Sequence, residues 1–67
     1  MATDYMRYVY PTSIDGKRHT DLWGVTWQVI GRNDAGVYYW RKVRHGKLAG
    51  KIFAGGDLDS AAKRLSA

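Results

Sequence analysis

The chain has 67 residues, with 11 Lys and Arg against 6 Asp and Glu, one Pro, no Cys and a formal net charge of +5. A chain of this length makes one domain and buries only about 60% of its unfolded surface, which leaves little stability for a deep catalytic cavity. Because there is no Cys, and His19 and His45 lie far apart in sequence, neither disulfides nor a zinc site is expected. Aromatic side chains must therefore supply much of the core.

Residues 1–21 are expected to hold a short edge strand followed by a loop. Side chains alternate over residues 5–10, and Pro11 ends the pattern, which is typical of an edge strand. Residues 11–20 are mostly polar, and Asp15-Gly16 favours a turn with a positive φ. The segment lacks the apolar run of a signal peptide, and no stretch is long enough to span a membrane, so we expect a cytoplasmic protein with no membrane partner.

Residues 22–53 are predicted to form an antiparallel meander of three strands. Residues 22–30 alternate apolar with polar side chains, and residues 37–44 are rich in β-branched and aromatic side chains. The strands are expected at 22–30, 37–44 and 47–53, with a hairpin loop at 33–36 and a two-residue turn at 45–46.

Residues 57–66 are predicted to form one C-terminal helix. Asp57 is placed to accept a hydrogen bond from the free backbone donors of a helix that starts at Leu58. Small and apolar side chains recur on one face, at Leu58, Ala61, Ala62 and Leu65. A helix of about ten residues is marginal alone, so it should cover the sheet. The predicted fold class is α+β, a three-stranded antiparallel sheet packed on one C-terminal helix, with residues 5–10 as an extra N-terminal strand.

Positive charge is concentrated in the middle of the sequence. Between Gly31 and Gly56 six cations face a single acid, Asp34, whereas residues 1–30 and 57–67 are each neutral in sum. The six cations are Arg32, Arg41, Lys42, Arg44, Lys47 and Lys51. Such clustering favours a polyanion as partner, and the alternative is an ordinary solvated face.

Alternation assigns these side chains to faces. If the helix covers the apolar side chains of residues 22–30, Thr26 and Gln28 point to the opposite face. On the next strand we expect Lys42 and Arg44 to face outward too, because burying them together is costly. The predicted nucleic-acid-binding residues are Thr26, Gln28, Arg32, Tyr38, Trp40, Lys42, Arg44, Lys47 and Lys51. The alternative makes Tyr38 and Trp40 core residues.

A cationic sheet face has a specific use with DNA, because a twisted antiparallel sheet can enter the major groove and project alternate side chains onto base edges. Lys and Arg neutralise phosphates or read guanine, and Gln28 can pair with adenine. Trp40 would lie along the sugar-phosphate wall, or stack on an unpaired base of a single strand. The expected partner is therefore DNA.

Four short motifs follow one another through the predicted meander and helix. They are Gly24-Val25-Thr26-Trp27, Tyr39-Trp40-Arg41-Lys42-Val43, Gly46-Lys47 with Phe53, and Asp57-Leu58-Asp59-Ser60-Ala61-Ala62. In this order they resemble the strands and helix start of the AP2 DNA-binding domain, which is known in plant transcription factors and in phage and bacterial homing endonucleases. Arm-site-binding domains of tyrosine-type integrases are its relatives. The resemblance covers roughly residues 24–66 and implies a role in transcription control or in phage or plasmid recombination.

Carried over by position, the resemblance implies DNA contacts from all three strands. They would fall on Thr26 and Gln28, on Lys42 and Arg44, and on Lys47 and Lys51. This chain departs from the family in its longer first hairpin, its short helix and the Ala54-Gly55-Gly56 segment before it. Thr26 and Gln28 also replace the family's arginines on the first strand.

The same residues leave other function classes open. A protein-binding module, such as a phage-encoded inhibitor, would dock an acidic partner through exposed Trp, Tyr and Arg, and a homodimer is also open. A cage of Trp23, Trp27 and Tyr39 around a methylated lysine is a third class. No enzyme is predicted, because no Ser has a nucleophile setting and no Gly-rich phosphate loop is present. No metal, cofactor or small-molecule substrate is expected.

Overall fold

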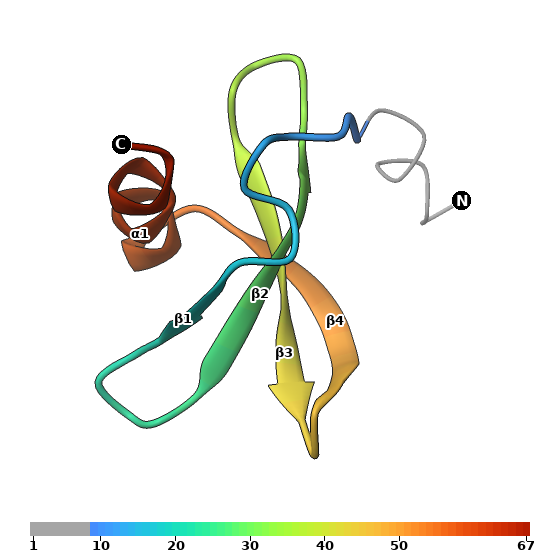
Figure 1. The fold of residues 1–67 in the computed structure, drawn as a ribbon, viewed down its shortest axis with the longest axis vertical. Helices are drawn as coiled ribbons and strands as arrows, with labels where there is room; N and C mark the ends of the chain where they lie inside the picture. Colours follow the sequence, from blue (N-terminus) through green and yellow to red (C-terminus); the bar gives the residue numbers. More distant parts are fainter. Residues whose placement is uncertain (1–8) are drawn as a thin grey trace.

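Four strands in sequence order form an antiparallel sheet, and a C-terminal helix packs on one of its faces (Figure 1). The computed structural model describes residues 9–67. Its elements are β1 (Arg18–Thr20), β2 (Thr26–Arg32), β3 (Tyr38–Arg44), β4 (Lys47–Ala54) and α1 (Asp57–Ser66). The α+β class, an antiparallel meander and the C-terminal helix are thus confirmed, but the strand expected at 22–30 begins only at Thr26, and the sheet has a fourth strand, β1. The strand expected at 5–10 lies largely outside the described residues, and at its end Tyr10 makes an isolated bridge with Arg32.

The short strand β1 corrects the prediction of a loop over residues 11–20. Its register pairs Arg18 with Gln28 and Thr20 with Thr26. Side chains reinforce both pairs, since Arg18 Nε donates to Gln28 Oε1 at 3.0 Å and the two threonine hydroxyls lie 3.0 Å apart. A three-residue polar strand has no apolar alternation, so its pairing partner rather than its sequence determines it.

The predicted turns are confirmed. Gly16 has a φ of 87°, and His45 and Gly46 have φ of 53° and 78°, as a two-residue hairpin turn with two left-handed positions requires. In the loop at 33–36, Asn33 Oδ1 accepts hydrogen bonds from the backbone N–H groups of Ala35 and Val37, at 3.0 and 2.9 Å. This side chain fixes the loop as asparagine does in Asx turns.

The core lies between the helix and the middle of the sheet. It comprises Ile14, Trp27, Val29, Trp40, Ala61 and Ala62. The two alanines leave room for the helix to approach the Trp40 indole, which is fully buried. Ile14 comes from the N-terminal loop and was not predicted. Lys17 holds the same loop to the helix, because its ammonium donates to the Leu65 carbonyl at 3.3 Å.

The side-chain register of β3 is opposite to the prediction. Directly paired residues of an antiparallel sheet share a face, and Trp40 pairs with Val29 while Lys42 pairs with Trp27. Even-numbered residues of β3 therefore lie on the helix side, and Tyr39, Arg41 and Val43 lie on the other. Trp40 is 0% exposed, so its expected outward placement is wrong and the core alternative is right.

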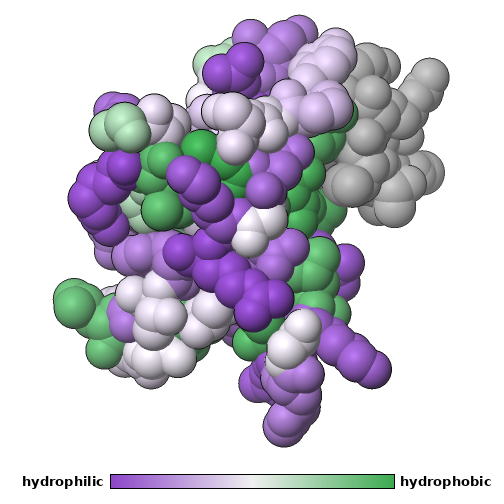
Figure 2. Space-filling view, in the orientation of Figure 1, coloured by the Kyte–Doolittle hydropathy of each residue, from purple (hydrophilic) through white to green (hydrophobic). Residues whose placement is uncertain are grey.

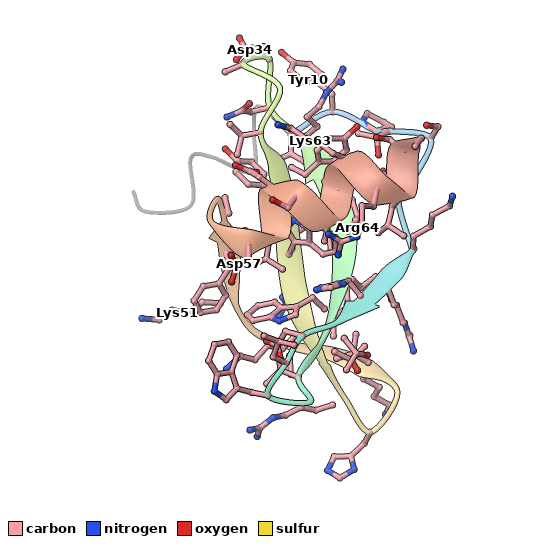
Figure 3. All side chains as sticks on the ribbon, turned by 90° about the vertical axis from the view of Figure 1, so that its left-hand side faces the viewer. Tyr10, Asp34, Lys51, Asp57, Lys63 and Arg64 are labelled. Carbon is pink, nitrogen blue, oxygen red and sulfur yellow. The ribbon has the colours of Figure 1, made fainter. Side chains whose placement is uncertain are left out.

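The physical reason is that the helix covers only part of its face. A ten-residue helix is about 15 Å long, and Figure 3 shows it crossing the strands over one half of their length. Lys42 and Arg44 lie beyond it, so α1 itself does not bury them. Lys42 is half-buried and Arg44 is exposed.

The helix start also differs from the prediction. Gly56 is the N-cap, Asp57 is already the first helical residue, and no side chain caps the helix. The carbonyl of Gly56 accepts instead from the Asp59 N–H at 3.1 Å. Asp57 and Asp59 in the first turn and Lys63 and Arg64 in the last still complement the helix dipole, as expected. Among residues 9–67, no helix is long and apolar enough to cross a bilayer.

Candidate nucleic-acid interface

Residues 38–54, here called the cationic hairpin, comprise β3, the His45-Gly46 turn and β4. Five cations lie on it, and no Asp or Glu occurs from residue 38 to 56. The cations are Arg41, Lys42, Arg44, Lys47 and Lys51. Arg44 pairs directly with Lys47 on the last rung before the turn. Like charges directly opposite one another destabilise a sheet, so this rung opposes folding and favours an anion.

Lys42 is held over aromatic rings. Its Nζ lies 5.7 Å from the ring centroid of Trp27 and 5.8 Å from that of Phe53. These are cation–π distances, and the two rings meet edge to face at a centroid separation of 5.1 Å. These contacts favour a position of the Lys42 ammonium at the surface of the sheet, on the helix side.

A bulge in β4 orients Lys51. Arg41 pairs with Ile52 and Lys42 with Ala49, so that Gly50 and Lys51 have no partner on β3. The Nε of Arg41 donates to the Gly50 carbonyl at 3.1 Å and closes the bulge. Bulges redirect side chains. Figure 3 shows Lys51 extending away from the body of the domain, as a side chain that reaches a distant anion must.

A hollow of about 240 Å³, here called the cationic hollow, lies between the start of β2 and the end of β3. Its lining is Gly24, Val25, Thr26, Lys42, Val43 and Arg44. Two of these six residues are cations and none is an acid. The lining is therefore positively charged.

Residues 21–25, here called the Trp23 loop, connect β1 to β2 and are organised by Asp21. One carboxylate oxygen accepts from the backbone N–H groups of Trp23 and Val25, both at 2.9 Å, and the other accepts from Trp27 Nε1 at 3.0 Å. The indole bond is the largest cause that holds the pKa of Asp21 below 3.8, and the two backbone bonds and His19 add to it against partial desolvation. Leu22 and Trp23 project from this fixed loop, 96% and 80% exposed.

The Trp23 loop and the turn of the cationic hairpin lie at the same end of the sheet. In a four-stranded meander the first and third connections share one end, and Figure 1 shows both below the helix. Figure 2 shows hydrophilic surface over the hairpin end and an apolar projection over the loop. The cationic hollow joins them, since Gly24 and Val25 come from the loop and Lys42 and Arg44 from the hairpin.

The structure does not bring the predicted binding residues together on one face. Thr26 and Gln28 lie on the sheet face away from the helix, where Gln28 accepts the bond from Arg18. Lys42, Arg44, Lys47 and Lys51 gather on the cationic hairpin. Arg32 and Tyr38 stack at the far end of the sheet, with the Arg32 Cζ 5.8 Å from the Tyr38 ring centroid. The contact set implied by the AP2 resemblance is therefore not one surface.

The aromatic cage is not assembled either. Trp27 and Tyr39 are 9% and 8% exposed and belong to opposite faces of the sheet, while Trp23 lies on the loop. Asp21-Leu22-Trp23-Gly24 is the sequence signal that could have identified the Trp23 loop, because an aspartate side chain can bond the backbone N–H two residues on and a following glycine allows the positive φ of a turn. Within residues 9–67 no three His, Asp or Glu side chains gather in a way that could hold a metal ion.

No family model, curated protein or solved structure matches this chain. Function is therefore inferred from the geometry of the cationic hairpin and the Trp23 loop.

Proposed function

We propose that the protein binds double-stranded DNA through the cationic hairpin. The observation that carries this proposal is the Arg44–Lys47 rung within an acid-free segment of five cations. A pair of cations directly opposite each other on neighbouring strands does not stabilise the fold. Phosphates on both sides of the hairpin would turn this repulsion into attraction, because each cation then gains an anionic partner.

The shape of the hairpin supports the same partner. A two-stranded ribbon fits the major groove of B-DNA, and the ribbon here ends in a turn whose residues 44–47 are all exposed. With the tip in the groove, Arg44 and Lys47 would reach phosphates or guanine edges. The cationic hollow would take a phosphate of the adjoining backbone, and Lys51 would extend to the flanking one. Gln28, which accepts a hydrogen bond from Arg18 on the other face, is then not a contact of this ribbon, and Thr26 takes part only as a wall of the cationic hollow.

The proposed role is in transcription control or in phage or plasmid recombination. This role rests on the resemblance to the AP2 domain alone. The proposed location is the cytoplasm. An acidic protein is the competing partner for the same cations, and competition with duplex DNA distinguishes the two.

The test neutralises the charged rung. Lys47→Gln and Arg44→Gln should each weaken binding to a mixed-sequence duplex and make the negative slope of log affinity against log salt shallower by about 0.9 per lost phosphate contact. Each should also raise stability, by roughly 0.2–1 kcal/mol, because the repulsion across the rung is removed. Fluorescence anisotropy at several salt concentrations and urea denaturation measure the two effects.

Lys63→Gln is the matched control, because Lys63 is an exposed cation on α1 and lies away from the hairpin (Figure 3). It should leave both slope and affinity near those of the native chain. Absence of binding at low salt would refute the proposal. Equal losses of affinity from Lys63→Gln and Lys47→Gln would show that the binding surface is not the hairpin.

A further inference from the structure

We infer that the Trp23 loop takes one unpaired nucleobase of the bound DNA, which stacks on the Trp23 indole. This inference rests on the proposed function and names the kind of DNA that the protein prefers: a duplex with a base out of its stack. The observations that carry it are the exposure of the Trp23 side chain, the hydrogen bonds that hold the loop around it, and the positions of the two hollows beside the loop.

Trp23 differs from the other two tryptophans. Trp27 and Trp40 are 9% and 0% exposed, whereas Trp23 is 80% exposed. Tryptophan side chains are usually largely buried in folded proteins, so an exposed one is unusual. Three hydrogen bonds to Asp21 and a bond from the Gly24 N–H to the Asp21 carbonyl, at 3.1 Å, hold the backbone on both sides of the ring. A flat ring on a fixed support is suited to stacking.

The cationic hollow places DNA beside this ring. Gly24 and Val25, the two residues that follow Trp23, line it together with Lys42 and Arg44. A phosphate held by the two cations would therefore carry its own nucleotide next to the indole. The lining of the cationic hollow has two cations and no acid, so its charge favours the phosphate of a nucleotide over an apolar protein segment as the occupant.

A second hollow lies on the helix side of the loop and can receive the base. Its volume is about 310 Å³, at the lower end of the range for small-ligand pockets, and Trp23 forms part of its wall. Asp57, Ser60 and Arg64 of α1 also line it. Figure 3 shows Asp57 and Arg64 on the lower side of the helix, toward the Trp23 loop. A carboxylate, a hydroxyl and a guanidinium provide both acceptors and donors for the edge of a base.

A duplex cannot offer a base to Trp23 without unstacking it. That costs a few kcal/mol, and least where the base is already unpaired. The protein should thus bind a duplex containing one unpaired base more tightly than the same duplex fully paired. Stacking should also quench the fluorescence of Trp23, the exposed indole among the three.

The experiment compares these two duplexes with the full chain and with Trp23→Ala. The native chain should favour the duplex with the unpaired base, and Trp23→Ala should weaken that complex roughly 5- to 100-fold while leaving the paired duplex nearly unaffected. Trp23→Tyr, which keeps a stacking ring, should restore most of the preference. Tyr10→Ala is the control, because Tyr10 is another exposed ring, 49% exposed, but lies beside Arg32 at the other end of the sheet.

The outcomes separate this inference from the proposed function. If Trp23→Ala binds both duplexes as tightly as the native chain does, the inference is wrong while the proposed DNA binding stands. The exposure of Trp23 would then favour a protein partner. Equal weakening on both duplexes would make Trp23 a contact of paired DNA and would also overturn it. If neither duplex binds at low salt, the proposed function itself fails.

Discussion

The two halves of the sheet are built from the same strands but differ in what they bury. In the half under α1, Val29 and Trp40 are 1% and 0% exposed against the alanines of the helix. A few residues along, the strands extend beyond the helix, and Arg44 and Lys47 are exposed to solvent. One half therefore supplies the folding energy, and the other is free to carry residues that oppose folding. Substitutions in each half test that division.

The largest expected effect is the loss of the central indole. Trp40→Ala should cost roughly 3–5 kcal/mol through lost burial and the cavity left behind. A domain of this length has a stability of about 3–10 kcal/mol, so the variant should be largely unfolded near 37 °C. Circular dichroism during urea denaturation measures this.

Trp40→Phe should cost much less, because the indole N–H of Trp40 is buried without an acceptor among residues 9–67 and the smaller ring removes that group. A Trp23→Ala melt indistinguishable from the native one completes the comparison. Comparable losses at Trp40 and Trp23 would contradict the division between the halves.

A smaller loss of stability is expected at Gly31, at the end of β2 where the chain before β1 crosses it. Its φ is 147°, and a Cβ there would overlap the side chain of Val9 and approach the Tyr10 carbonyl at 3.1 Å. Gly31→Ala should therefore cost roughly 1–3 kcal/mol. Thermal melting measures it, and Gly36→Ala, where a Cβ meets nothing within 4 Å although φ is 88°, separates crowding from backbone strain. Equal costs at the two glycines would show that crowding contributes nothing.

The smallest effect concerns pH and the Trp23 loop. The folded pKa of Asp21 is below 3.8, so its carboxylate stabilises the fold above that value, and this contribution is lost as pH falls from 3.8 through the folded pKa. Asp21→Asn should be less stable than the native chain at neutral pH. The two melting temperatures should converge in acid. A constant difference down to the lowest pH would mean that the ionised carboxylate contributes nothing to the loop.

Much of the fold follows from sequence pattern, and the exceptions have local causes. Alternation in β2, the His45-Gly46 turn and the spacing of Ala61 and Ala62 are strong signals, because backbone geometry itself requires them. β1 has none, since an edge strand of three polar residues is specified by its neighbour. Ile14 is one apolar residue in a polar loop, and only the tertiary fold shows that it enters the core.

The candidate site was predicted in composition but not in arrangement. The sequence identifies the cations of the hairpin, but their predicted face is wrong, because the helix is shorter than the strand and does not bury a lysine at position 42. The lengths of the helix and of the strand can both be estimated from the sequence, so this signal was present. The importance of Trp23 depends on exposure, which follows from the Asp21 hydrogen bonds and not from any periodic pattern.

The bulge at Gly50 and Lys51 has a consequence for association between copies of the chain. Of the described strands, β4 is the longest, with eight residues, and it lies at an edge of the sheet, where backbone N–H and C=O groups are open to another strand. A flat edge of this length would be a template for aggregation. Lys47, Lys51 and the interrupted ladder make it a poor one, since an incoming copy would meet like charge and a kinked backbone. The positive charges proposed to hold DNA therefore also keep the chains apart, and DNA that neutralises them would remove part of that protection.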